Sequence, residues 1–250
     1  SVYARYMEIL GHSCTIPEGG YEGEYIKNIA SNIYNEHGSS LENKKDNPIF
    51  KERAENLIFK DIEETLLKIG MEFDAFFNEN TLYDNGDIDK VIELLNDKGL
   101  IYKKDGATWF KGTELGRDVD RVMIKSTGEP TYRLPDIAYH RNKFDRKYDL
   151  MIDVFGADHM DAYPDVIAAT SALGYEKNKI KVLIHQFVTI IKDGAPIKMS
   201  TRKANFIGLD ELIDDVSSDV TRFFFIMRGM NTHLNFDLDI AKEQSEINPV

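Results

Sequence analysis

The stretch KYDLMIDVFGADHMDAYPDVIAATSALGYEKNKIKVLIH, residues 147–185, decides the fold class. It contains two short apolar runs, at 150–155 and 181–184, on either side of a segment with helical composition at 164–174. Pro164 suits the first turn of that helix, where its missing N–H is not needed. Strand, helix and strand with short connections form a β-α-β unit, whose strands pair in parallel. The sequence therefore predicts an α/β protein with a parallel sheet.

A first group of candidate site residues follows the first apolar run. Gly156 ends the predicted buried strand, so Ala157, Asp158 and His159 lie at its carboxyl end, the edge of an open parallel sheet where ligands bind. Gly156 lets a ligand approach the backbone, and Asp158 can accept hydrogen bonds from a ribose hydroxyl or hold a backbone amide. The alternative is a capped strand-to-helix turn with solvated polar residues. Spacing alone leaves both interpretations open.

The segment TYRLPDIAYH, residues 131–140, gives a second candidate. Tyr132 and Asp136 are four residues apart, and His140 follows Asp136 by another four. If a helix begins at Asp136, behind Pro135, the carboxylate lies at the positive end of the helix dipole, where it is ionised and suited to a cation. The alternative is a plain helix cap, which the segment by itself favours.

Positive charge gathers in one loop, although the whole chain carries a formal net charge of −12. A predicted hairpin turning at Asp193-Gly194 leads into KMSTR, residues 198–202, which brings Lys198 and Arg202 close to Ser200. These donors suit a polyphosphate, whose developing negative charge must be neutralised in phosphoryl and adenylyl transfer. A solvated turn is the alternative.

Composition excludes several classes of protein. No stretch approaches the roughly 18 apolar residues of a membrane span, and a single cysteine, Cys14, allows no internal disulfide. No HExxH or CxxC pattern occurs, so we predict no metal site. The acidic balance argues against general coating of nucleic acid, which depends on cations. We expect a soluble cytoplasmic protein that does not associate with membranes.

Several segments, in order along the chain, resemble arginyl-tRNA synthetases. KMSTR is similar to the KMSKS signature of class I aminoacyl-tRNA synthetases, and five other segments resemble the arginine enzymes specifically. These are GYEGEYI (20–26), TYRLPDIAYH (131–140), FGADHMDAYPDV (155–166), MSTRKANFI (199–207) and THLNFDLDIAKEQSEINPV (232–250). The resemblance implies a Rossmann-type parallel sheet with flanking helices and an inserted α+β subdomain. It also implies activation of L-arginine with ATP and Mg²⁺, transfer to tRNA(Arg), and no tightly bound cofactor.

The resemblance implies roles for individual residues. Lys198, Met199, Ser200 and Arg202 would be catalytic and hold the ATP phosphates. Gly156, Ala157, Asp158, His185 and Lys198 would bind ATP. Glu79, Tyr132, Asp136 and His159 would bind arginine. Paired carboxylates suit a guanidinium, because it is planar, has five donors and keeps its charge.

The chain departs from the family pattern in ways that bear on activity. No His-x-Gly-His occurs, which the class requires as its second signature, and Thr201 and Ala204 replace a lysine and a glycine of the loop. We therefore expect a fold that is incomplete at both ends and a piece inactive alone, cut from a longer, monomeric enzyme. Another nucleotidyltransferase of the same superfamily and a non-catalytic RNA-binding module are the alternatives.

The expected domain organisation has four parts. Residues 1–40 would complete the first half of the catalytic core, 41–120 form the inserted subdomain, 121–208 form the second half with the basic loop, and 209–250 form a helical stem. Within the insertion, MEFDAFFNENTLY at 71–83 suggests short extended runs.

Overall fold

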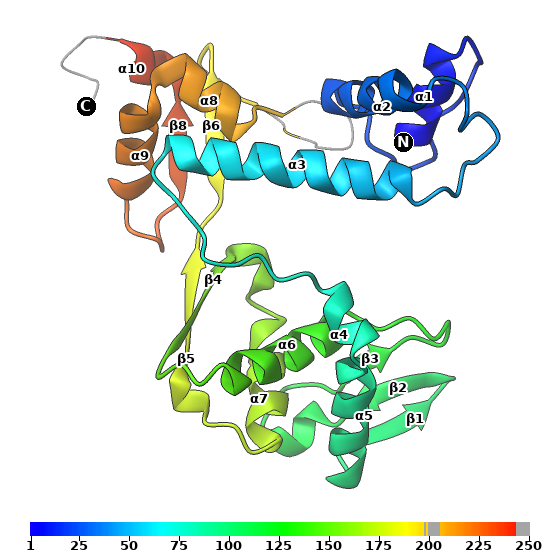
Figure 1. The fold of residues 1–250 in the computed structure, drawn as a ribbon. Coiled ribbons are helices and arrows are strands. Elements are labelled where there is room, and N and C mark those ends of the chain that lie inside the picture. The colour runs from blue at the N-terminus through cyan, green and yellow to red at the C-terminus, as the bar shows by residue number, and fades with distance from the viewer. Residues whose placement is uncertain (198, 200–205, 244–250) are drawn as a thin grey trace. The chain divides into compact units, whose positions relative to one another are not determined.

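The computed structural model describes residues 1–197, 199 and 206–243, and their contacts define two compact units. Unit 1 consists of 1–73, 188–228 and the chain from 234 on, and unit 2 consists of 74–187 and 229–233 (Figure 1).

The units do not coincide with the four expected segments. Residues 41–73 pack in unit 1, whereas 74–120 pack with 121–187 in unit 2. The four-part division therefore stays a prediction about the family's architecture.

Three helices form one layer of unit 1: α1 (Val2–Ile9), α2 (Glu24–His37) and α3 (Ile49–Lys68). Apolar residues of α2 recur every three or four positions, so one face of the helix is buried. Tyr6 of α1 and Ile33 of α2 are fully buried, and Phe50 of α3 packs edge-on against the Tyr6 ring. The core therefore requires all three helices together.

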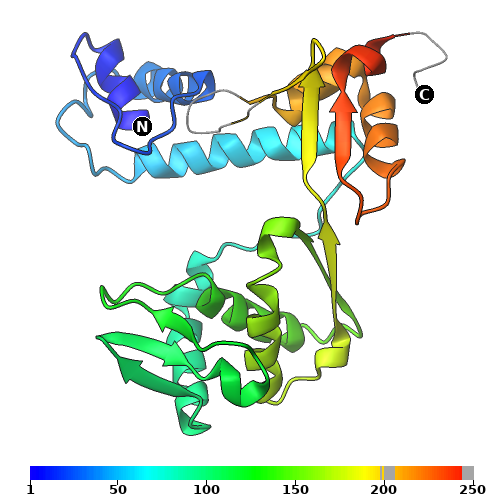
Figure 2. The same cartoon turned by 180° about the vertical axis from the view of Figure 1, so that it is seen from behind.

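A small mixed sheet forms the other part of unit 1. In it, β6 (Val188–Lys192) pairs in parallel with β8 (Leu234–Asp237) and antiparallel with β7 (Ala195–Pro196) (Figure 2). Asp193 and Gly194 both have positive φ between β6 and β7, which confirms the predicted hairpin. The helices around this sheet are α8 (Leu209–Val216), α9 (Ser218–Ile226) and α10 (Leu238–Lys242).

The N-terminal part of unit 2 consists of an antiparallel sheet and two helices. The strands are β1 (Ile101–Lys104), β2 (Ala107–Phe110) and β3 (Arg121–Ile124), and the helices are α4 (Asn80–Asp84) and α5 (Asp87–Asp97). Asp105 and Gly106 turn between β1 and β2 with positive φ, as the sequence predicts. The expectation of extended runs at 71–83 is wrong, because the structure has no strand in these residues, α4 begins at Asn80 and Leu82 is buried in the core of the unit.

The β-α-β unit is present as predicted. Strand β4 (Met151–Gly156) pairs in parallel with β5 (Ile180–His185), and α7 (Tyr163–Ala172) connects them. Helix α6 (Arg133–Asp145) packs against α7, and both helices contribute to one buried core. Short 3₁₀ turns occur at Gly112–Leu115, Ala157–His159 and Lys177–Lys179.

Strand β4 is buried on one face. Met151 and Asp153 are buried, whereas Ile152 and Val154 are 52% and 65% exposed. The expectation of a buried strand therefore holds for one face only, because in unit 2 the helices cover a single face. The apolar run could not reveal this, since apolar residues occur on both faces of the strand.

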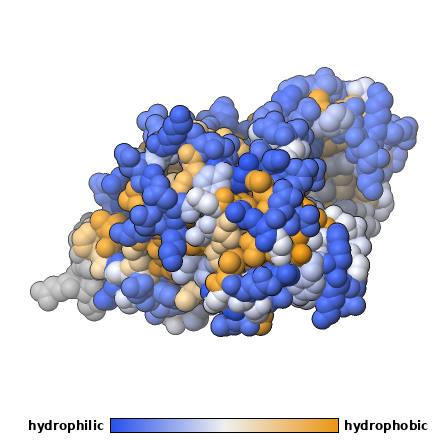
Figure 3. Space-filling model, turned by 90° about the horizontal axis from the view of Figure 1, so that it is seen from below, coloured by the Kyte–Doolittle hydropathy of each residue, from blue (hydrophilic) through white to orange (hydrophobic). Residues whose placement is uncertain are grey.

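The surface agrees with the charged composition. The face in Figure 3 is mostly hydrophilic, with apolar patches between the polar side chains. No helix in the described part of the chain has both the length and the hydropathy that crossing a membrane needs.

Candidate functional site

A hollow lies on the covered face of β4 in unit 2. It is small, because the space inside it that a water-sized sphere can occupy is about 10 Å³, room for one water molecule. Helix α6 contributes Asp136 and His140, β4 contributes Asp153 and Phe155, and His159 follows in the 3₁₀ turn. These side chains meet because the end of a parallel strand and the start of a neighbouring helix lie at the same edge of the sheet.

His140 holds the polar base of the hollow together. Its Nδ1 lies 2.8 Å from the backbone carbonyl oxygen of Asp136, one helical turn earlier, and its Nε2 lies 2.8 Å from Oδ2 of Asp153. Lys143, also on α6, donates to the other oxygen of Asp153. Because His140 and Asp153 are both buried, these bonds fix the position of α6 against β4.

Among the described residues, none donates a hydrogen bond to the side chain of Asp136, the other carboxyl group of the hollow. Burial raises the pKa of Asp136, and the nearby positive groups of His140, His159 and Lys143 offset this only in part. A partly buried carboxyl that is costly to ionise gains most when a cation enters beside it. The arrangement therefore favours a cationic ligand.

Asp153 has the opposite electrostatic character. Burial opposes its ionisation, but the hydrogen bonds from His140 and Lys143 outweigh this and hold the pKa of Asp153 below its usual value. It is therefore a satisfied structural carboxylate beneath the hollow, whereas Asp136 is available to a ligand.

The structure brings two of the four predicted arginine-site residues into the hollow, namely Asp136 and His159. The ring of His159 stacks on Phe155 at 5.0 Å between centroids. Tyr132 precedes α6 and is 87% exposed, and Glu79 precedes α4 and is also exposed. Neither lines the hollow, although α4 and α6 contact each other.

The sequence placed the start of α6 slightly too late. The helix begins at Arg133, so Asp136 lies in its first turn and does not open it. The predicted interaction with the positive end of the helix dipole still applies there, because the dipole acts over the first turn.

The four predicted ATP-site residues in unit 2 gather at the carboxyl ends of β4 and β5. Gly156 and His185 are register partners, and Ala157 and Asp158 follow directly. A Cβ on Gly156 would lie 2.5 Å from Oδ1 of Asp158, so a larger residue here would require the exposed Asp158 carboxylate to move. His185 Nδ1 lies 2.6 Å from the carbonyl oxygen of Gln186.

The predicted catalytic loop is almost entirely outside the described residues. This applies to Lys198, Ser200 and Arg202, whereas Met199 is described and exposed. In the described part of the chain, no group of three or more histidine, cysteine, aspartate or glutamate side chains is placed to hold a metal ion.

Sequence reasoning missed Asp153, Lys143 and Phe155 as parts of the site. The signal for Asp153 was a single carboxylate within an otherwise apolar run, which calls for a buried partner. The partners, His140 and Lys143, lie in another segment, so spacing along the chain could not identify them.

Comparison with known proteins identifies the protein family to which the chain belongs. Residues 21–227 match the family model described as tRNA synthetases class I (R), catalytic domain. A crystal structure of an arginyl-tRNA synthetase assigned in Campylobacter jejuni superimposes with a TM-score of 0.87 and 29% identity, over 99% of this chain and 56% of that one. The chain therefore belongs to the class I arginyl-tRNA synthetases and represents their catalytic domain.

Relatives of known name agree with this family. The chain is 55% identical over its whole length to the arginine--tRNA ligase of Desulfotalea psychrophila and 54% identical to that of Chlorobium limicola. It covers 45% and 46% of those two proteins, so it spans about half the length of these relatives. The Thermus thermophilus arginyl-tRNA synthetase, at 15% identity and a TM-score of 0.60, shares the fold.

Proposed function

We propose that the hollow beside β4 binds the guanidinium of L-arginine in an enzyme that activates arginine with ATP and transfers it to tRNA(Arg). The observation that carries this proposal is the Asp136 carboxyl group, which lies partly buried in the hollow and has no hydrogen-bond partner for its side chain among the described residues. The relatives named arginine--tRNA ligase support the reaction. The position of His159 at the same hollow supports a polar ligand there.

The energetics favour a guanidinium over a neutral ligand of the same shape. A charge-assisted hydrogen bond contributes roughly 1.5 to 3 kcal/mol, and a guanidinium can make two of them to one carboxylate. A neutral analogue leaves the carboxylate unpaired in a buried position. A site whose carboxylate needs a charged partner therefore discriminates strongly between a guanidinium and a neutral analogue.

ATP belongs at the ends of β4 and β5 in this proposal. Gly156, Ala157 and Asp158 would contact the adenosine, with His185 on the neighbouring strand. Lys198, Ser200 and Arg202 would hold the phosphates together with Mg²⁺. The positive side chains of Lys198 and Arg202 would neutralise the charge on the leaving pyrophosphate. Glu79 and Tyr132, which lie at the starts of α4 and α6, would contact the arginine ligand at the solvent-exposed mouth of the hollow.

Binding of arginine and of L-citrulline to the chain tests the proposal. Citrulline has nearly the same shape but a neutral end group, so we expect calorimetry to give an affinity weaker by roughly 10²- to 10⁴-fold, the equivalent of two charge-assisted bonds. Binding is the suitable readout, because the sequence contains no His-x-Gly-His and turnover is not expected.

The same titrations separate the alternatives. Equal affinities for arginine and citrulline would contradict a guanidinium site. ATP binding without any arginine binding would instead favour a different nucleotidyltransferase.

A further inference from the structure

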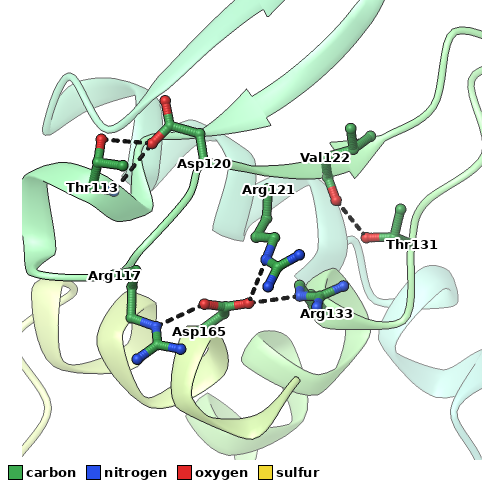
Figure 4. Close-up of polar contacts among 8 residues, drawn as sticks. All are labelled: Thr113, Arg117, Asp120, Arg121, Val122, Thr131, Arg133 and Asp165. Carbon is green, nitrogen blue, oxygen red and sulfur yellow. Dashed lines mark hydrogen bonds and ion pairs between the residues drawn. The ribbon is translucent and has the colours of Figure 1, made fainter. Parts of the chain in front are cut away.

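A second polar cluster in unit 2 surrounds Asp165, in the first turn of α7. Its side chain is 1% exposed and is contacted by three arginines from three separate segments (Figure 4). The Nε atoms of Arg117, Arg133 and Arg121 lie 2.8, 3.0 and 3.2 Å from its carboxylate oxygens. One carboxylate therefore holds three guanidinium groups, which leaves a local excess of two positive charges.

The arginines retain most of their donors. Each approaches Asp165 through Nε, and in the described part of the chain no terminal nitrogen of Arg117, Arg121 or Arg133 has a hydrogen-bond partner. Arg121 is the most open of the three, with a side chain 36% exposed. In Figure 4 the terminal nitrogens of Arg121 and Arg133 lie next to each other, on one side of Asp165.

The carboxylate next to Arg121 in the sequence makes its hydrogen bonds away from the arginines. Asp120 precedes Arg121 in the sequence, but Oδ1 accepts hydrogen bonds from the backbone N–H and the hydroxyl of Thr113, at 3.0 and 2.8 Å. Its Oδ2 accepts from the hydroxyl of Tyr102. Figure 4 shows the Asp120 carboxylate at Thr113, away from the guanidinium groups.

Guanidinium groups whose terminal nitrogens have no hydrogen-bond partner among the described residues are suited to binding a phosphate. Arginine matches phosphate oxygens with paired, planar donors and is weakly hydrated, so partly buried guanidinium groups bind phosphate better than lysines do. In nucleic-acid complexes such contacts go to the backbone and position the partner without reading its sequence. We infer that Arg117, Arg121 and Arg133 form a binding site for a backbone phosphate of the RNA substrate, an inference that rests on the proposed function.

The site lies on the opposite side of α7 from the hollow. Tyr163, Val166 and Ile167 line the hollow, whereas Asp165 does not. Successive helix residues are rotated by roughly 100°, so Asp165 points away from the mean direction of those three. A ligand in the hollow lies on the side of α7 that faces away from Asp165, so we take an RNA backbone, rather than ATP, as the source of the phosphate in the proposed reaction.

The substitution Arg121→Gln tests the inference, because Asp165 keeps its hydrogen bonds from Arg117 and Arg133 and the fold is preserved. The affinity of the whole chain for transcribed tRNA(Arg) is measured over a series of salt concentrations. We expect a loss of about tenfold near 0.1 M salt and a salt slope reduced by roughly 0.7 to 0.9, the value for one lost phosphate contact.

Lys98→Gln is the matched control, because it removes one exposed positive charge of the same unit, away from the cluster. It should change neither affinity nor slope, and saturating ATP should leave the effect of Arg121→Gln unchanged. Equal slopes for wild type and Arg121→Gln, displacement of the RNA by ATP, or absence of tRNA binding by the wild-type chain would each overturn the inference. Arginine binding, measured in parallel, reports on the proposed function alone and should be the same in Arg121→Gln and wild type.

Discussion

Replacing Asp136 with asparagine is expected to weaken arginine binding by roughly 10²- to 10⁴-fold, while ATP binding stays within a few-fold of wild type. Asparagine keeps the shape of the side chain but removes the charge that pairs with a guanidinium. The loss therefore falls on the cationic ligand. Calorimetric titration of the variant with arginine and, separately, with ATP measures both effects.

Two comparisons make this result specific. Asp161→Asn removes an exposed carboxylate just beyond the 3₁₀ turn that does not line the hollow, so it should bind arginine as wild type does. Asp136→Asn should also be at least as stable as wild type at pH 7. The pKa of Asp136 is raised by folding, so its ionisation opposes folding increasingly as the pH rises from its unfolded value through its folded value. Equal losses of arginine and ATP affinity would refute the assignment.

The second large effect concerns stability. Asp153→Asn is expected to lower the free energy of unfolding of unit 2 by about 3 kcal/mol at pH 7, because it leaves His140 and Lys143 facing a neutral group in a buried position. Urea denaturation followed by a probe in unit 2 measures this. The matched control is Asp149→Asn, which removes an exposed carboxylate just before the same strand and should change stability little.

The effect of Asp153→Asn should depend on pH in a defined direction. Folding lowers the pKa of Asp153 from its unfolded value near 3.9, so its contribution is fully present above that value and is lost as the pH falls through the folded pKa. Wild type and Asp153→Asn should therefore begin to converge in stability as the pH falls below about 4, and should converge fully below the folded pKa of Asp153. A difference that stays constant from pH 7 to pH 3 would show that the carboxylate charge is not what stabilises the fold.

Local patterns predicted most of the elements. The two Asp-Gly hairpins and the β-α-β unit followed from residues adjacent in the sequence, because turn geometry and strand-helix alternation are set within short segments. The parallel pairing of β6 with β8 joins strands far apart in the chain, and nothing in either strand specified it. Helix α4 was missed because a five-residue helix shows too little periodicity.

The site residues that could be predicted are those that lie within segments resembling the family. Asp136 and His159 lie in two of the segments that carry the family resemblance, and the structure places both in one hollow. Asp165 was not predicted, because an aspartate in the first turn of a helix is also a usual stabilising residue. Its arginines come from a loop, a strand and a helix start, so only the tertiary structure assembles the cluster.

The most direct test of the guanidinium site is the pKa of the Asp136 carboxyl, followed by ¹³C NMR with and without saturating arginine. The account predicts a pKa above the ordinary aspartate value in the free protein, because the carboxyl is partly buried, and a clear fall when arginine binds, because a guanidinium favours the ionised form. A pKa that is the same in the presence and absence of bound arginine would contradict it.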